Sequence, residues 1–165
     1  MGSHGNDRNP YPERSGAIPI GQDASSIVFL HALAKPAGYV TGDNNIFDFQ
    51  DSADLLGWYE IEYEDGFVTT VPIRYRWNIL DLKNEAGAVA YGADVVDHIG
   101  GAKFYAFEWT NPRLGKAIRQ IRLNGSQGFR NYKGEPIPSN AIILAAVSIV
   151  PKREKPKRQD PPFPK

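Results

Sequence analysis

The sequence predicts an all-β protein in which two antiparallel sheets pack face to face as a β-sandwich. Three observations support this fold class. The 165 residues include 16 glycines, 13 prolines and one methionine, a composition that favours short strands and tight turns over helices. Apolar segments of strand length recur along the chain between turn residues. Helical periodicity nowhere extends much beyond about two turns.

The first half of the chain contains three expected strands. Residues 26–32 form a nearly continuous apolar run, which is typical of a buried strand. Residues 58–63 alternate between two sets of side chains, as a half-buried strand does. Asp65 and Gly66 follow, and this pair indicates a hairpin because a primed turn needs positive φ. Residues 67–73 are therefore expected to return beside residues 58–63.

Four further strands are expected in the second half, over residues 89–91, 103–109, 117–123 and 141–150. Pro112 stops the second of them, because proline offers no hydrogen-bond donor to a sheet. Asn124 and Gly125 are expected to form a turn after the third. The last strand is the most apolar, and the regular spacing of all these segments indicates a two-sheet sandwich.

Both ends of the chain are expected to lie outside the sandwich. We interpret residues 1–17 as an expression scar and a flexible arm with at most an edge strand. Residues 151–165 are rich in proline and lysine, which indicates a linker or tail. The β-sandwich module is therefore expected over residues 18–150, as one module cut from a larger protein.

The charge distribution and the composition exclude several function classes. The chain has 19 basic and 19 acidic residues, but residues 151–165 hold six basic and two acidic ones, a net of +4, so residues 1–150 sum to −4. A mildly acidic body argues against nucleic acid as a partner. The absence of cysteine excludes disulfides and thiolate chemistry. The longest apolar run is too short to span a membrane.

The motifs of common enzyme classes are also missing. We find no nucleophile elbow, phosphate-binding loop, dinucleotide fingerprint or zinc-protease signature, and we expect that the protein is not an enzyme. His31 lies in the apolar run at residues 26–32 and is interpreted as a satisfied buried histidine rather than a ligand. Glu60 and Glu62 share a strand face, and paired carboxylates can cleave glycosidic bonds. Alternating acids, however, usually form the solvent side of a strand.

An acidic loop over residues 43–54 gathers oxygen donors of the kind that calcium binds. A structural calcium ion is one interpretation of this loop, and a solvated loop without an ion is the other. No other cofactor is expected. The weak candidates for metal ligands are Asp43, Asn45 and Asp48.

Aromatic and polar residues that follow the expected strand at residues 67–73 indicate a sugar site. A sugar offers apolar C–H faces and many hydroxyl groups, so its site needs an exposed ring beside hydrogen-bonding groups. Trp77 is either such a platform or a core residue that closes one end of the sandwich. Tyr132, in a Gly-rich loop, is a second candidate platform. The candidate ligand-binding residues are Trp77, Arg76, Asn78, Asp81, Tyr132 and Arg130.

Several segments, taken in order, carry a resemblance to a known family. They are Phe29-Leu30-His31-Ala32, Gly57-Trp58-Tyr59, Tyr63-Glu64-Asp65-Gly66, Val71-Pro72-Ile73, Asn78-Ile79 with Asp81, Glu108-Trp109-Thr110-Asn111-Pro112, and Ile118 with Ile121. Their order and spacing over residues 27–150 resemble the jelly-roll accessory domains, of galactose-binding-like type, that stand beside catalytic domains in bacterial polysaccharide-degrading enzymes.

The resemblance implies a sandwich of jelly-roll type that acts as a non-catalytic carbohydrate-binding or accessory module. The implied partners are a polysaccharide or oligosaccharide and a catalytic domain in the same parent chain, and the implied location is secreted, cell-surface or periplasmic. Two alternatives stay open. One is a structural module that packs against a neighbouring domain and binds no ligand. The other is a small polysaccharide lyase or hydrolase.

Overall fold

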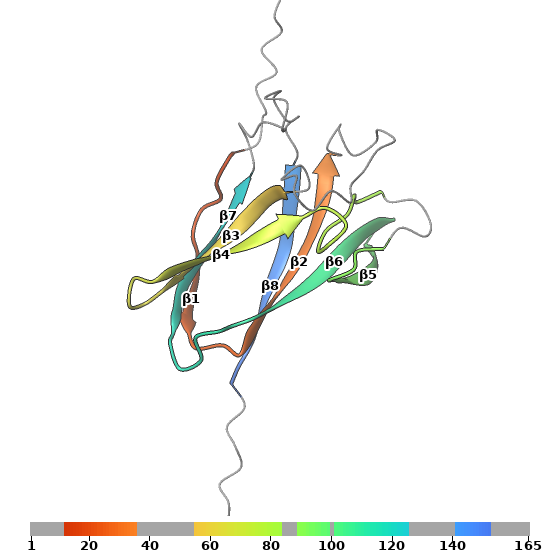
Figure 1. Cartoon of the computed structure of the whole chain (residues 1–165). Coiled ribbons are helices and arrows are strands. Elements are labelled where there is room, and N and C mark those ends of the chain that lie inside the picture. The colour runs from red at the N-terminus through yellow and green to blue at the C-terminus, as the bar shows by residue number, and fades with distance from the viewer. Residues whose placement is uncertain (1–11, 36–54, 84–88, 100, 126–140, 153–165) are drawn as a thin grey trace, which may run out of the picture.

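The computed structural model describes residues 12–35, 55–83, 89–99, 101–125 and 141–152 (Figure 1). Within these residues the chain forms eight strands and no helix, and hence no helix that could cross a membrane. The strands are β1 (Ile18–Gln22), β2 (Ser26–Lys35), β3 (Leu55–Tyr63), β4 (Val68–Arg74), β5 (Asp94–Ile99), β6 (Ala102–Thr110), β7 (Ile118–Gly125) and β8 (Ala141–Val150). The predicted all-β fold of two antiparallel sheets is confirmed.

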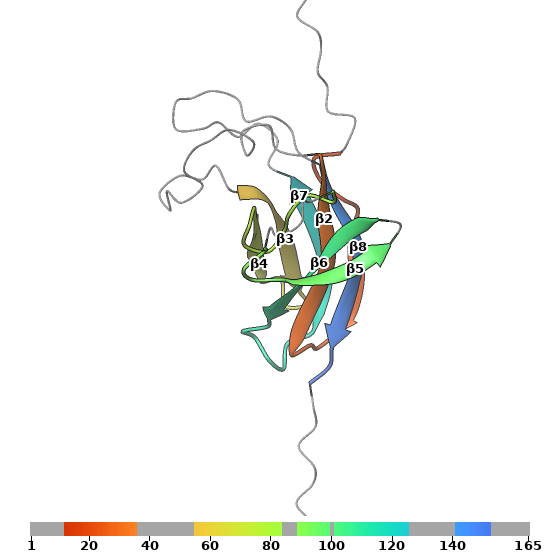
Figure 2. The ribbon, with the colours of Figure 1, turned by 90° about the vertical axis from the view of Figure 1, so that its right-hand side faces the viewer.

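The two sheets have four strands each and face one another across the core (Figures 1 and 2). Sheet A has the strand order β1-β7-β3-β4, and sheet B has the order β5-β6-β2-β8. The chain stays within one sheet only at the hairpins β3–β4 and β5–β6, and every other connection passes from one sheet to the other. Each sheet is therefore assembled from segments that are distant in the sequence.

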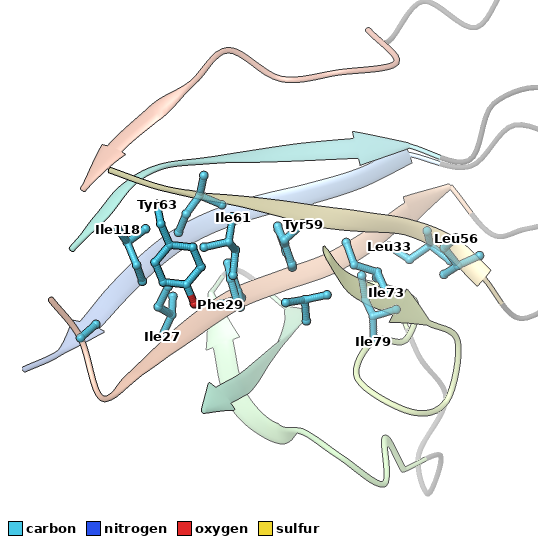
Figure 3. Packing of buried hydrophobic residues seen from close by; sticks show 13 residues of the cluster. Ile27, Phe29, Leu33, Leu56, Tyr59, Ile61, Tyr63, Ile73, Ile79 and Ile118 are labelled. Atoms are coloured by element: carbon cyan, nitrogen blue, oxygen red, sulfur yellow. The ribbon is translucent and has the colours of Figure 1, made fainter. Parts of the chain in front are cut away.

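The core lies between the sheets and is filled from both sides (Figure 3). Ile27 and Phe29 of β2 and Tyr59 and Ile61 of β3 are fully buried. Because successive side chains of a strand point to opposite faces, residues two apart share the inner face. The rings of Phe29 and Tyr59 stack across the two sheets, with centroids 3.9 Å apart and 8° between their planes. The buried strand predicted at residues 26–32 is therefore confirmed.

The strand predicted over residues 89–91 is wrong, since these residues are a loop and the strand lies further on, at β5. The backbone of this loop is bonded to another loop instead of to a sheet. Tyr91 N–H donates to the Arg76 carbonyl at 3.0 Å, and Gly92 N–H donates to the Trp77 carbonyl at 2.6 Å. These long-range hydrogen bonds decide the local structure.

The turn predicted at Asn124 and Gly125 is also wrong, because both residues lie inside β7. Gly125 pairs with Gly57 of β3, and Asn124 pairs with Trp58. Pairing with β3 thus outweighs the local preference of an Asn-Gly pair for a turn.

The β3–β4 hairpin is confirmed, but its turn differs from the primed turn expected. Gly66 N–H donates to the Tyr63 carbonyl at 3.0 Å, and Tyr63 N–H donates to the Phe67 carbonyl at 2.9 Å. Gly66 has a φ of 82°, whereas Glu64 and Asp65 do not have positive φ. This is a three-residue loop in which a type I turn precedes a left-handed glycine.

The hairpin tip is fastened to the loop between β6 and β7. Arg113 forms a bidentate ion pair with Asp65, with N–O distances of 3.0 and 2.9 Å. The guanidinium lies 4.7 Å from the ring centroid of Tyr63 and 4.3 Å from that of Phe67. The Tyr63 hydroxyl donates to the buried Asn111 Oδ1 at 2.6 Å. These contacts close this end of the sandwich with charge-assisted and cation–π interactions.

Part of the N-terminal arm lies along the edge of sheet A, where the sequence analysis allowed at most an edge strand within residues 1–17. Arg14 pairs with Asn124 of β7, and Ser15 N–H donates to the Leu123 carbonyl at 2.8 Å. Gly125 N–H donates to the Glu13 carbonyl at 2.8 Å. Pairing along β7 therefore begins before β1.

We predict that Gly57→Ala destabilises the fold by about 1–3 kcal/mol, measured by urea unfolding. A Cβ atom at Gly57 would overlap the backbone oxygen of Asn124, and that oxygen belongs to a neighbouring strand that cannot easily move aside. Gly16→Ala is the matched control, because a Cβ atom there meets nothing within 4 Å and Gly16 does not have positive φ. Equal unfolding midpoints for the two variants would contradict this close approach.

Candidate functional site: an exposed tryptophan on a braced loop

The loop that follows β4 is built around the side chain of Asn78. Asn78 Oδ1 accepts a hydrogen bond from the Arg74 backbone N–H at 2.8 Å, and Asn78 Nδ2 donates to the Pro72 carbonyl at 2.9 Å. The residue is only 1% exposed. Its amide therefore holds the end of β4 and the loop in one shape, and it faces the protein rather than solvent.

A buried histidine from the opposite sheet fastens this loop from below. His31 of β2 is fully buried, and its Nε2 lies 2.6 Å from the backbone oxygen of Asn78. A carbonyl can only accept, so Nε2 carries the proton and donates it. Nδ1 therefore accepts a hydrogen bond from the Tyr59 hydroxyl, at 2.7 Å. Both ring nitrogens are satisfied, which confirms the interpretation of His31 as a satisfied buried histidine.

His31 is neutral because burial in the aromatic core disfavours its charged form. Desolvation lowers its pKa from 6.5 to about 4, against the opposing effect of the hydrogen bond to Asn78. The imidazole lies nearly parallel to the Phe107 ring, with 5° between the planes and 6.3 Å between the centroids. We call the chain Tyr59–His31–Asn78 the histidine brace. It joins sheet A, sheet B and the loop after β4.

Trp77 lies on this braced loop and is 54% exposed, so it does not plug the core. One edge of its indole rests on Gly92, where an added Cβ atom would lie 2.9 Å from Trp77 Cε2 and 3.0 Å from Nε1. The Trp77 carbonyl accepts the Gly92 N–H. The ring is thus seated on backbone along one edge, while about half of the residue remains open to solvent.

A second exposed aromatic residue, Tyr91, lies on the adjoining loop and was not among the sequence-predicted residues. Tyr91 is 71% exposed, and its N–H donates to the carbonyl of Arg76. Tyr91 belongs to the segment at residues 89–91 that was expected to form a strand, and for this reason it was not a candidate for the site. An aromatic residue directly before glycine, in a segment without strand alternation, is the signal that would have found it.

Arg76 and Asp81, the other two predicted ligand-binding residues near Trp77, have different surroundings. Arg76 is partly buried and adopts a φ of 62°, which is unusual for a residue other than glycine. Asp81 Oδ2 accepts a hydrogen bond from the Tyr75 hydroxyl at 2.9 Å, while Oδ1 is buried without a hydrogen-bond partner in the part of the chain that the structure describes. Burial, followed by this hydrogen bond, raises the pKa of Tyr75. Asp81 therefore faces the protein, as Asn78 does.

The remaining predicted site residues lie outside the described residues. These are Tyr132, Arg130, Asp43, Asn45 and Asp48. Among residues 12–35, 55–83, 89–99, 101–125 and 141–152, no group of three or more histidine, aspartate or glutamate side chains could hold a metal ion. The calcium site stays a prediction.

Glu60 and Glu62 lie on the outer face of sheet A and are paired with arginines. Arg122 Nη1 lies 3.5 Å from Glu60 Oε1 and 3.4 Å from Glu62 Oε2, and Arg14 forms a further ion pair with Glu60. A hydrogen bond from Gln120 is the main cause that lowers the pKa of Glu62. A glycosidase needs a carboxylic acid whose pKa is raised, whereas the pKa of Glu62 is lowered. These surroundings favour the interpretation of Glu60 and Glu62 as part of an ion-pair network on the solvent side of the strand.

Comparison with known proteins adds no relative to this description. No protein-family model, curated protein or solved structure matches the chain.

We predict that acid destabilises the fold through His31 between about pH 6.5 and pH 4. The unfolded chain binds a proton at His31 below pH 6.5, whereas the folded protein resists it until about pH 4. The free energy of unfolding therefore falls as the pH drops through this window, by about 3 kcal/mol in total. Urea unfolding at a series of pH values measures the slope.

Two variants separate the histidine brace from other acid-sensitive groups. His31→Gln is expected to be less stable at pH 7 but to lose the slope between pH 6.5 and pH 4. Asp65→Asn is expected to keep it, because the hydrogen bond from Arg113 lowers the pKa of Asp65 to about 2 and places its titration below this window. A slope that survives in His31→Gln would rule out His31 as its source.

We predict that Arg76→Gly stabilises the protein by about 0.5–1 kcal/mol, because glycine adopts a φ of 62° without the strain of a Cβ atom. Thermal and urea unfolding measure the change. A loss of stability would mean that contacts of the Arg76 side chain outweigh the backbone strain.

Proposed function

We propose that this protein is a non-catalytic carbohydrate-binding or accessory module that holds a polysaccharide or oligosaccharide on Trp77. The single observation that carries the proposal is a half-exposed indole on a loop whose backbone is bonded to the core. An aromatic ring stacks on the apolar C–H face of a sugar. Because the histidine brace already fixes the loop, little ordering is needed on binding.

Neighbouring side chains complete the proposed site. Tyr91 offers a second ring and a hydroxyl, and Arg76 offers guanidinium donors to sugar hydroxyls. Asn78 and Asp81 act in the proposal through the shape of the loop, since their polar atoms face the protein. A shallow site of this kind binds with a dissociation constant of ~0.1–1 mM. Attachment to a catalytic domain in the same parent chain makes such weak binding effective, because it raises the local concentration.

The resemblance in the sequence supports placing the module among the galactose-binding-like accessory domains, with a sandwich of jelly-roll type and a secreted, cell-surface or periplasmic location. Its matched segments fall on β2, on the β3–β4 hairpin, on the loop after β4, on β6 with the start of the loop that follows it, and on β7. The repeated passage of the chain between the two sheets fits that proposal.

A second candidate function is packing against a neighbouring domain without a ligand. The observation that favours it is the outer face of sheet B, where Val96, Ile143 and Val150 are each more than a third exposed. Exposed apolar faces often mark protein interfaces. This candidate needs no contribution from Trp77.

We predict that affinity electrophoresis on a panel of neutral and uronate-bearing polysaccharides retards the protein on at least one of them. Trp77→Ala is expected to weaken that binding at least about tenfold through loss of stacking, and Tyr91→Ala to weaken it severalfold. Urea unfolding of each variant shows whether the fold is kept.

Phe67→Ala is the matched control for this experiment. Phe67 is an aromatic residue that is 50% exposed, and it lies at the opposite end of β4 from Trp77. It is expected to leave the retardation unchanged. Equal losses in the Phe67 and Trp77 variants, or no retardation on any polysaccharide, would reject the Trp77 site and favour the packing function.

A further inference from the structure

The two sheets have four edge strands, β1, β4, β5 and β8. An edge strand presents backbone N–H and C=O groups that can pair with a strand of another chain. Proteins commonly block this pairing with proline, with charged side chains or with irregular strands. The four edges of this protein differ sharply in such protection.

Three of the four edges carry blocking features. β1 contains Pro19 and loses regular pairing with β7 between Pro19 and Gln22. β4 contains Pro72, which removes a donor within the strand. β5 begins with the charged Asp94, and its pairing with β6 is irregular.

β8 has neither a charged residue nor a proline in its ten residues. It contains one bulge, because Ala146 pairs with Leu30 and Leu144 pairs with His31, which leaves Ala145 as the extra residue. Beyond the bulge, residues 146–150 pair regularly with β2 on one side. In the part of the chain that the structure describes, no strand is hydrogen-bonded to its other side.

We propose that residues 146–150 of β8 pair antiparallel with the same residues of a second copy of this chain. The pairing would join two copies of sheet B into one continuous sheet around a two-fold axis. In such a pair each residue faces a residue of the same segment, so a charged segment would repel itself. The uncharged segment Ala-Val-Ser-Ile-Val meets this requirement, and the small, exposed Ser148 lies at its centre.

Sedimentation velocity over a concentration series tests the pairing on the full chain. The protein is expected to dimerise reversibly, and Ser148→Lys is expected to raise the dimer dissociation constant at least about tenfold, because it sets two lysines opposite each other on the edge. A monomer at every concentration would overturn the proposal.

Thr110→Lys is the matched control. Thr110 is exposed on the same outer face of sheet B, but it lies on β6, which β2 separates from β8. The control adds the same charge and is expected to leave the dimer intact. If both lysine variants dissociate the dimer equally, the copies associate through the sheet face, and edge pairing is wrong.

Cysteine cross-linking tests the register, because the chain has no cysteine of its own. Directly opposed residues of antiparallel strands have Cα atoms about 4.5–5.5 Å apart, which suits a disulfide. Ser148→Cys is expected to form a covalent dimer on oxidation, and Thr110→Cys is not. Ala146→Cys and Val150→Cys are expected to cross-link when mixed. Absence of both cross-links would overturn this pairing.

Discussion

The hydrogen bonds of one neutral imidazole determine how this protein presents its exposed loop. His31 accepts a hydrogen bond from the Tyr59 hydroxyl of sheet A and donates one to the backbone carbonyl of Asn78. Inside the aromatic core, an unpaired nitrogen or hydroxyl would cost about 1–3 kcal/mol, so the three groups stabilise one arrangement of the two sheets and the loop. The position of Trp77, one residue before Asn78, follows from that arrangement.

Aromatic residues lie beside polar groups at both ends of β4, but the polar groups lie against the rings at one end and against the backbone of the loop at the other. Before β4, the Arg113 guanidinium lies against the rings of Tyr63 and Phe67 and forms an ion pair with Asp65. The cation therefore interacts with both the rings and the carboxylate. After β4, the buried His31 forms its hydrogen bond with the backbone of Asn78 on the core side of the loop. The indole of Trp77 on the same loop remains about half exposed to solvent. A ring with unused surface on a fixed backbone is what a binding platform requires.

The outer faces of the two sheets differ in the chemistry of their exposed side chains. On the outer face of sheet A, Glu60 and Glu62 form ion pairs with arginines of the arm and of β7, and these arginines compensate the charges of the two carboxylates. On sheet B, the outer face is largely apolar and ends at the uncharged edge of β8. We therefore propose association with a second copy on the side of sheet B and sugar binding at the loop after β4.

The sequence by itself determined the all-β class, the buried strand at β2 and the β3–β4 hairpin, because side-chain alternation and the Asp-Gly signal act between close neighbours in the chain. It also drew attention to Trp77. Only the tertiary structure decided that Trp77 is exposed, that Asn78 faces the protein, and that Tyr91 adjoins the site. Each of these depends on hydrogen bonds from distant segments, such as those of His31 and Gly92, which no local pattern records.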